Sequence, residues 1–294
     1  MLKSSLLFLL LALLLSIDAS AQQWRTVSEK RKANISGMAL VEYDKQHTIF
    51  LVVHDNKKED QPRAAIVTVH GNDTPKYTPL EWAGKDIPGD LESVTAIPGV
   101  AGQFIALTQG GRGYQIKLDL TKNEVEPLRS FDVPMKPKEP EFEAFALQKV
   151  NGALIAVWAD RGSPDRPATL FCSMFDPASD TFSTTSASQV IVPYPTDFVR
   201  HIADVKVDAS GVVYIVSTSD PGKDGPFASA FYQIGKVTVG PGKQAAFTRQ
   251  PVFTQLRKFD HHKVEGFEFV PAPGGGIAFG TDDENLGASI FLTY

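Results

Sequence analysis

The residues best suited to do chemistry in this chain are three glutamates that stand at the same point of a recurring pattern. Glu92, Glu143 and Glu265 each occupy the second position of a short, mostly apolar run. Ser36 and Ala203 hold that position in two further runs, and the five positions are 56, 51, 60 and 62 residues apart. A period of this size predicts a repeat architecture. None of the five positions is Lys or Arg, so the pattern itself offers no cation.

If the repeats bring these positions together, the three carboxylates converge. An unpaired carboxylate taken from water costs several kcal/mol, so such a ring needs a cation. Oxygen ligands suit Ca²⁺, which takes six to eight of them at about 2.3–2.6 Å, whereas Zn²⁺ prefers His and Cys. We therefore predict a Ca²⁺ site with Glu92, Glu143 and Glu265 as ligands. Ser36 would add its hydroxyl or carbonyl and Ala203 its carbonyl; the alternative is that the glutamates point to solvent.

The elements that must position these residues are short β-strands. Each copy is followed by a second and a third apolar run, and most units end in a looser fourth. The runs are rich in Val, Ile, Phe and Thr and are bounded by Gly, Pro, Asn and Asp, which is typical of strands and turns. Four antiparallel strands repeated radially form the blade of a β-propeller. The predicted fold is therefore an all-β, five-bladed β-propeller whose innermost strands surround a central channel.

The fifth unit lacks a fourth run, and a spare segment before the first repeat can supply it. The last unit ends with its third run at Tyr294, while Trp24 to Ser28 precedes the first copy. We predict that Trp24 to Ser28 pairs with Ser289 to Thr293 as the outer strand of the last blade. This pairing would cover an otherwise open sheet edge.

The N-terminus predicts export. Lys3 is followed by the apolar stretch Leu6 to Ile17 and by the small-residue site Ala19-Ser20-Ala21, a signal-peptide pattern too short to span a membrane. Residues 1–21 are thus expected to be a signal peptide, and 22–294 a single domain of a secreted or periplasmic protein. We expect a monomer without a membrane span. Cys172 is the only cysteine, so no disulfide can form within the chain, and its apolar run indicates a packing role.

Composition is ordinary for a soluble globular protein, with 43% hydrophobic and 21% charged residues in a chain of 294. The formal net charge of -5 argues against a nucleic-acid partner, which would favour a basic patch. A small anionic substrate or another ligand remains the expected partner.

The last copy of the pattern resembles a known motif. Lys263-Val264-Glu265-Gly266-Phe267-Glu268-Phe269-Val270 is similar to the last-blade motif of the calcium-activated nucleotidases, the secreted apyrase family. The order of Ser36, Glu92 and Glu143 also follows that family, although Ala203 stands where the family has Ser. The repeats further resemble bacterial propellers described as having esterase-like activity of phytase. These resemblances imply five blades, one Ca²⁺ in the channel and hydrolysis of phosphate esters or related esters.

Candidate catalytic residues lie in the loops. The nucleotidases carry an Asp-Asp-Arg-Thr-Gly loop in the first blade; here the stretch is His54-Asp55-Asn56-Lys57, and the family's Trp-containing insertions are missing. Asp55 is the candidate for activating or orienting water. Arg112 and Arg161 are candidates to clamp phosphate oxygens through paired planar donors. Lys57 and Lys223 are weaker candidates, and the alternative for every loop charge is simple solvation.

Two other functions stay open. The chain shows no convincing nucleophile–base pair, which favours a non-catalytic binding or scaffold propeller with a structural Ca²⁺. His261-His262 does not change this, because the pair is expected in a solvent-exposed turn. Some five-bladed propellers cleave sugars with convergent carboxylates about 5–10 Å apart, and the channel glutamates could act in this way.

Overall fold

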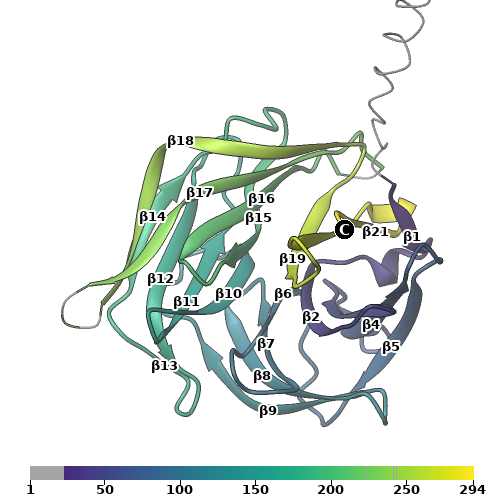
Figure 1. Ribbon diagram of the computed structural model, residues 1–294. Helices are drawn as coiled ribbons and strands as arrows, with labels where there is room; N and C mark the ends of the chain where they lie inside the picture. The colour runs from purple at the N-terminus through teal and green to yellow at the C-terminus, as the bar shows by residue number, and fades with distance from the viewer. Residues whose placement is uncertain (1–22, 223, 241, 243) are drawn as a thin grey trace, which may run out of the picture.

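The computed structural model describes residues 23–222, 224–240, 242 and 244–294, which form a ring of antiparallel sheets around a central axis (Figure 1). The predicted signal peptide, residues 1–21, and the candidate Lys223 lie outside the described residues. Helix in the described part is limited to two short 3-10 turns, η1 (Arg31–Ala33) and η2 (Glu284–Leu286). Among these residues, no helix has the length and apolar character needed to cross a membrane.

The first three blades follow one another along the chain, and each begins with its innermost strand. Blade one contains β2 (Gly37–Tyr43), β3 (His47–Val53), β4 (Ala64–His70) and β5 (Lys76–Trp82). Blade two contains β6 (Leu91–Ala96), β7 (Gln103–Thr108), β8 (Arg112–Asp119) and β9 (Glu124–Asp132). Blade three contains β10 (Phe142–Val150), β11 (Ala153–Asp160), β12 (Ala168–Asp176), β13 (Thr181–Phe182) and β14 (Ser186–Val190). A short parallel contact between the outer strands β5 and β9 joins blades one and two into one eight-stranded sheet.

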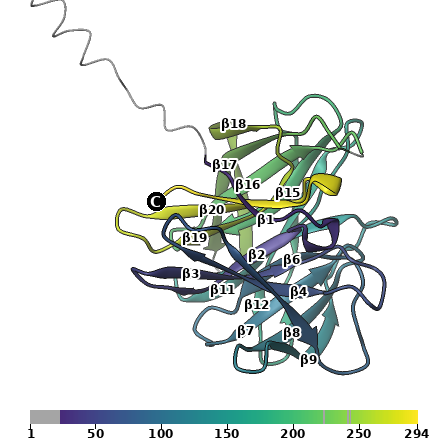
Figure 2. The same ribbon diagram turned by 90° about the vertical axis from the view of Figure 1, so that its right-hand side faces the viewer.

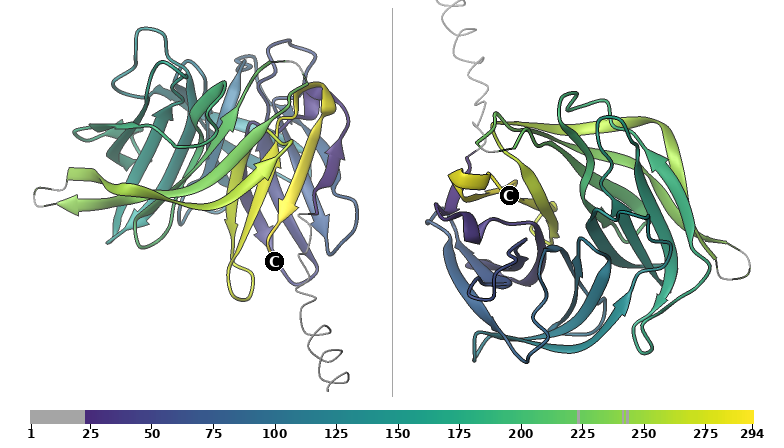
Figure 3. Two further views of the ribbon diagram at one scale, coloured as in Figure 1. Left: turned by 90° about the horizontal axis from the view of Figure 1, so that it is seen from above. Right: turned by 180° about the vertical axis from the view of Figure 1, so that it is seen from behind.

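Blade four has the longest strands. It contains β15 (Val199–Val207), β16 (Val212–Ser219), β17 (Ala228–Gly240) and β18 (Gln244–Asp260). The sequence predicts a fourth run over Ala246 to Phe253 only, but β18 has 17 residues and forms a long hairpin with β17. Figure 3 shows this hairpin reaching beyond the rest of the ring.

The ring closes through the N-terminal strand, as predicted. Blade five contains β19 (Val264–Val270), β20 (Gly276–Thr281), β21 (Ala288–Leu292) and, as its outer strand, β1 (Arg25–Ser28). The antiparallel register places Arg25 opposite Ile290 and Thr26 opposite Ser289. In the side view, β1 runs beside the C-terminal strands (Figure 2). The structure therefore confirms the pairing of Trp24–Ser28 with the last strand of the chain.

Apolar side chains gather between the blades. The described residues form five buried apolar clusters, and each joins two adjacent blades of the ring. The inner strands also contact one another in a closed cycle, from β2 through β6, β10, β15 and β19 back to β2. Burial of apolar surface between blades thus stabilises the ring. The starts of the inner strands, in contrast, carry buried charges.

Candidate cation site and active site in the channel

Each of the three predicted glutamates sits at the same irregularity of its inner strand. The residues on either side of Glu92 pair with consecutive residues of β7, so Glu92 is an extra residue in its strand. The same one-residue β-bulge holds Glu143 in β10 and Glu265 in β19. A bulge re-aims the side chain it carries and recurs near functional sites. The three glutamates are structurally equivalent, which agrees with the repeat alignment.

All five aligned positions are buried. Glu92, Glu143 and Glu265 are 5%, 1% and 2% exposed. Ser36, directly before β2, is 1% exposed, and Ala203 in β15 is fully buried. Ala203 lies in a longer irregularity of its strand, between Arg200 and Asp204. The fourth position therefore differs from the others in backbone as well as in side chain.

Three cations reach the glutamates from positions just outside the repeat pattern. Arg200 Nη1 lies 3.0 Å from Glu265 Oε1 and 3.6 Å from Glu143 Oε1. Arg161 Nη1 lies 2.9 Å from Glu143 Oε1, and Lys263 Nζ lies 3.3 Å from Glu265 Oε1. This corrects the expectation that only a metal ion could offset the ring, since two of the three carboxylates already have cationic partners.

The wider ion-pair network still carries an excess of negative charge. It joins seven carboxylates to five cations in the described part of the chain. The carboxylates are Glu141, Glu143, Asp160, Asp220, Glu265, Asp282 and Glu284, and the cations are Arg31, Arg161, Arg166, Arg200 and Lys263. With all groups ionised the network bears two negative charges, and ionised Glu92 beside it adds a third.

The charges of the network hold its cations protonated. Burial alone would lower the pKa of Lys263, but the carboxylates of Glu265 and Asp282 outweigh burial and raise it. Arg200 follows the same balance, with Glu143 and Glu265 raising its pKa against the effect of burial. Both cations are therefore fixed parts of the channel.

Glu92 and Ser36 are the two ring residues without partners. No hydrogen bond or ion pair joins the Glu92 carboxylate to another described residue, and burial, followed by the charges of Glu143 and Glu265, raises its pKa well above the usual value. The Ser36 Oγ is buried without a hydrogen-bond partner in the described part of the protein. The backbone at Gly37, the residue after Ser36, packs closely on the backbone at Glu92: a Cβ on Gly37 would lie 3.0 Å from the Glu92 carbonyl oxygen and 2.7 Å from the Ser93 Cα. The unpaired Ser36 hydroxyl and the unpaired Glu92 carboxylate therefore belong to neighbouring segments of the chain.

Asp55 lies at the edge of this charged cluster. It is partly buried in the loop after β3, and burial, followed by the charge of Asp282, raises its pKa to about 6, while Lys263 acts in the opposite direction. Among the described residues, none forms a hydrogen bond or ion pair with its carboxylate. Asp55 also contributes to the raised pKa of Glu92. The loop residue singled out from the sequence thus belongs to the electrostatic environment of the ring.

The predicted arginine clamp does not assemble. Arg161 binds Glu141 and Glu143, so its guanidinium is committed to carboxylates. Arg112 begins β8, the third strand of blade two, and its side chain is 50% exposed; it bonds Ser130 Oγ at 2.8 Å and packs over the Tyr114 ring. Lys57 is paired with Asp90 at 3.0 Å. Of the candidate substrate contacts, Asp55 and Arg161 share the channel cluster and Arg112 stands apart.

Sequence reasoning missed two of the three cations, Arg200 and Lys263, and a second buried layer of charges. Arg200 and Lys263 precede the aligned positions by three and two residues, a signal present in the fourth and fifth copies only. Further along β15, Lys206 Nζ donates to the carbonyls of Met38 and Val94 and lies 3.8 Å from Asp204. Burial raises the pKa of Asp204 to about 7. The signal in the sequence was the presence of two charged residues, Asp204 and Lys206, two positions apart in an apolar strand.

The contacts of Cys172 and His262 and the exposure of His261 show what surrounds the remaining residues that the sequence singled out. Cys172 is fully buried between blades three and four, which confirms its packing role. His261 is exposed in a turn, as expected, but His262 is not a free surface residue. Its Nδ1 lies 2.8 Å from Asp283 Oδ2, and its ring lies 4.2 Å from that of Trp24, centre to centre. His262 therefore helps to attach the closing strand.

The fold and channel define this protein as a five-bladed β-propeller. No protein-family model matches the chain, and no curated protein has a matching sequence.

Several solved structures have a fold similar to that of this chain. An endo-arabinase from Bacteroides thetaiotaomicron is 10% identical with a TM-score of 0.53, covering 92% of this chain and 97% of its own. An α-L-arabinofuranosidase from Podospora anserina in complex with cellotriose is 10% identical with a TM-score of 0.53, covering 93% and 97%. A β-fructofuranosidase from Bombyx mori is 11% identical with a TM-score of 0.52, covering 92% and 61%. These similarities show the propeller fold and do not support the resemblance to apyrases or phytase-like propellers.

Proposed function

We propose that this protein is a hydrolase of uncharged glycosides, with Asp55 as its proton-transfer group and a Ca²⁺ ion held in the channel beside it. The observation that carries the proposal is the partnerless, partly buried carboxylate of Asp55, whose pKa is raised to about 6. A general base works best when its pKa lies near the working pH and no fixed partner occupies it. Asp55 meets both conditions at the edge of the ring.

The residues that would hold the cation are Glu92 and Ser36, which have no partners within the described ranges, and Glu265, whose Oε2 is likewise unpaired there. They supply oxygen donors of the kind Ca²⁺ prefers. The orphan hydroxyl of Ser36 and the excess negative charge of the network both support the fit. When bound there, the ion would neutralise the ring and polarise an oxygen of the substrate. Glu143 would contribute less than the sequence suggests, because Arg161 and Arg200 already contact it.

The charge of the cluster supports an uncharged substrate. Arg161, Arg200 and Lys263 each contact two or more carboxylates, so none is left to bind a phosphate. A phosphate dianion would also approach a group of acids that outnumbers its cations, and juxtaposed like charges cost several kcal/mol. The phosphate-ester substrate implied by the sequence resemblance is therefore not the one we propose.

The chemistry of carboxylates supports a glycosidic bond. In the described part of the chain no histidine bonds the side-chain hydroxyl or thiol of a Ser or Cys, so a nucleophile–base pair for ester cleavage is lacking. Glycoside hydrolysis needs only carboxyl groups as acid, base or nucleophile. The named structural neighbours of this propeller, an endo-arabinase and an arabinofuranosidase, agree with that choice.

A metal-free variant of the same reaction is the second candidate. Burial raises the pKa of Glu92 well above its usual value and that of Asp55 to about 6, and this version requires a pH at which Glu92 keeps its proton while Asp55 is ionised. Two carboxyl groups with separated pKa values can act as general acid and general base. In this version a proton takes the place of the cation on Glu92.

The experiment is a panel of p-nitrophenyl substrates: α-L-arabinofuranoside, β-D-galactoside, acetate and phosphate, each with added Ca²⁺ or with EGTA. We expect turnover of a glycoside that Asp55→Asn lowers by at least 100-fold, in line with the usual weight of a general base. Loss of turnover in EGTA supports the cation-assisted version, and unchanged turnover supports the metal-free one. Turnover of phosphate alone, or activity that survives Asp55→Asn, would contradict the proposal. No turnover of any substrate, with Ca²⁺ still stabilising the fold, would favour the non-catalytic binding propeller.

The proposal fits an exported protein. Extracellular modules bind Ca²⁺ with dissociation constants of about 10⁻⁴–10⁻³ M. A site of this affinity fills only where the free Ca²⁺ concentration is as high as it is outside the cytoplasm. Release of the chain into the periplasm or medium, with its N-terminus near Gln22, is the corresponding expectation, checked by fractionation and N-terminal sequencing.

A further inference from the structure

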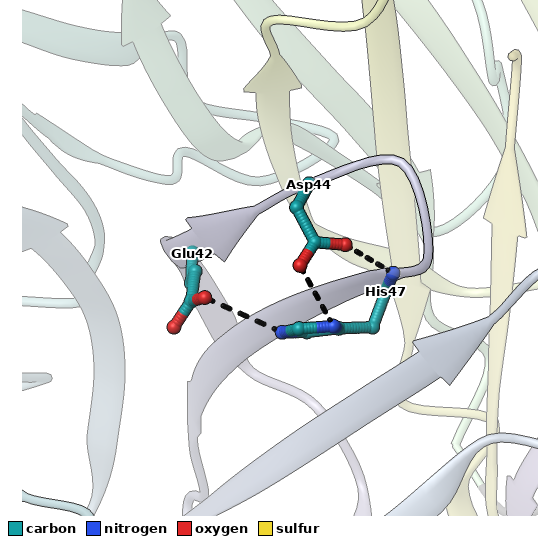
Figure 4. A group of neighbouring side chains, drawn as sticks. All are labelled: Glu42, Asp44 and His47. Carbon is teal, nitrogen blue, oxygen red and sulfur yellow. Dashed lines mark hydrogen bonds and ion pairs between the residues drawn. The ribbon is translucent and has the colours of Figure 1, made fainter.

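A second cluster of ligand-type side chains lies on the hairpin between β2 and β3, away from the start of the inner strands. Figure 4 shows Glu42, Asp44 and His47 facing one another, with the His47 ring between the two carboxylates. His47 Nδ1 lies 3.1 Å from Asp44 Oδ2, and His47 Nε2 lies 3.4 Å from Glu42 Oε1. Of the His, Cys, Asp and Glu side chains described, only these form a group of three with ligand atoms within 4.8 Å of one another.

A neutral His47 ring cannot donate hydrogen bonds to both Asp44 and Glu42. A neutral imidazole carries one N–H, so only one of its two nitrogens can donate to a carboxylate. Asp44 is the better acceptor, because its Oδ1 is already fixed by the backbone N–H groups of Gln46 and His47 at 2.6 and 2.8 Å. In the tautomer with its proton on Nδ1, the Nε2 lone pair faces Glu42, and a cation between the two would bind both.

The separation fits a specific geometry. Tetrahedral zinc lies about 2.0–2.1 Å from His nitrogens and carboxylate oxygens, which puts two such ligands roughly 3.3–3.4 Å apart. The Nε2–Oε1 distance at this site is 3.4 Å. An N–H···O hydrogen bond would be shorter, at about 2.7–3.2 Å. The contact is longer than a typical N–H···O hydrogen bond and matches the spacing of two ligands on one metal ion, as well as that of a His–carboxylate ion pair.

A second histidine stands beside the first. His70 ends β4 and is the cross-strand partner of His47, with ring centres 5.7 Å apart. Its side chain is exposed, and in the site proposed below it turns toward Glu42. A hollow of about 180 Å³ borders the cluster, lined in part by Asp44, His47 and Gly71. Of Glu42, His47 and His70, His47 lines this hollow. A tetrahedral ion held by three protein ligands keeps a fourth position open.

We propose that Glu42, His47 and His70 bind a transition-metal ion of the Zn²⁺ class, with Asp44 orienting the His47 ring. Imidazole with carboxylate ligands suits Zn²⁺, Cu²⁺ and Ni²⁺ and does not suit Ca²⁺. A carboxylate bonded to the far nitrogen of a ligating His fixes the tautomer and strengthens the ligand. The site has an open coordination position and takes water or a small anionic ligand there.

The test is a Zn²⁺ titration of the chelator-treated protein, residues 22–294, against a chromophoric competitor. We expect one Zn²⁺ per chain with a dissociation constant in the micromolar range or below. His47→Ala should weaken binding at least 100-fold, and Asp44→Asn by 10- to 100-fold, the usual effect of losing an orienting partner. Co²⁺ substitution should give the visible absorption of a four-coordinate ion.

Matched variants separate this site from incidental binding. His261→Asn removes another exposed histidine, tolerates the positive φ of 66° at that position, and should leave Zn²⁺ affinity unchanged. Glu92→Gln alters the channel and should also leave it unchanged, so failure of the channel proposals does not affect this one. Zn²⁺ binding that is equally tight in His47→Ala, or no binding below about 100 μM in the wild type, overturns the proposal. Circular dichroism of each variant establishes that loss of binding is not loss of fold.

Discussion

Arg200 joins two blades by a partly buried ion pair: its Nη1 lies 3.0 Å from Glu265 Oε1, although the two residues belong to β15 of blade four and β19 of blade five. Arg200 also contacts Asp220 through Nη2. The guanidinium thus bridges neighbouring inner strands at the level of the glutamate ring. Since the pKa of Arg200 is raised by these acids, it is a permanent positive charge in the channel.

Removing this charge should destabilise the protein strongly. Arg200→Gln would leave Glu265 with Lys263 as its nearest cation and leave Glu143 with Arg161, in a network that is already negative. Breaking one side of a fully buried ion pair costs about 3–5 kcal/mol. The Arg200 side chain is 20% exposed, so we expect a loss at the lower end of that range in urea unfolding. Arg112→Gln is the control, because that arginine is exposed and should change stability by less than about 0.5 kcal/mol. Equal effects of the two substitutions would mean that Arg200 is not a structural charge.

The effect of Glu92→Gln on stability should change sign when Ca²⁺ is added. Without a cation, Glu92→Gln removes a buried carboxylate that has no partner, so the variant should be as stable as the wild type or more stable. With Ca²⁺ in excess, the wild type should gain about 2.7 kcal/mol at 100 times the dissociation constant, and the variant should gain little. Thermal unfolding with EGTA and with Ca²⁺ measures all four states. A wild type that ignores Ca²⁺, or a variant that responds equally, would exclude Glu92 as a ligand.

The repeat pattern predicted the fold, the closing strand and the equivalence of the glutamates, because each depends on strand-length signals that recur along the chain. It could not predict the charge balance. Arg161, Arg200 and Lys263 reach the ring through long side chains from neighbouring positions, and nothing in their spacing shows where those side chains end.

The pairing of Arg112 with Arg161 as one substrate clamp could not be tested from the sequence for a related reason. Arg112 and Arg161 both follow an apolar strand in a turn that contains glycine, so the sequence does not distinguish them. In the structure Arg161 follows the second strand of its blade, while Arg112 opens the third and turns to Ser130 on β9. Distance from the propeller axis depends on strand order within the blade. Only the assembled ring shows which loop charges face the channel.

Asp55 should make stability and activity depend on pH in opposite ways. Its folded pKa of about 6 exceeds the ordinary value of 3.8, so the folded state binds the proton more tightly than the unfolded chain. This contribution is fully present below pH 4 and is lost as pH rises through 6. Asp55→Asn should therefore stabilise the protein by about 2–3 kcal/mol at pH 8 and have little effect at pH 4.

Activity should follow the ionised form. Turnover of the glycoside by the wild type should rise with pH around an apparent pKa near 6, because the base must be unprotonated. Urea unfolding at pH 4 and pH 8 and a pH–rate profile test the two halves independently. An Asp55→Asn variant that is less stable than the wild type at pH 8 would show that Asp55 has a stabilising partner and is not a free base.

Ring closure should depend on one glycine at the entrance to β21. Gly287 has φ 86° and ψ -152°, and a Cβ there would lie 2.1 Å from the Ser28 carbonyl oxygen on the closing strand. Gly287→Ala therefore combines backbone strain of about 1–3 kcal/mol with a clash that pushes β1 off the last blade, and we expect a total cost of about 3 kcal/mol or more. Gly274→Ala is the matched control, since its φ is 85° and no atom lies within 4 Å of the added Cβ. It should cost only the backbone strain. Thermal unfolding and limited proteolysis after Arg25 compare the two variants, and equal losses would mean that β1 does not secure the ring.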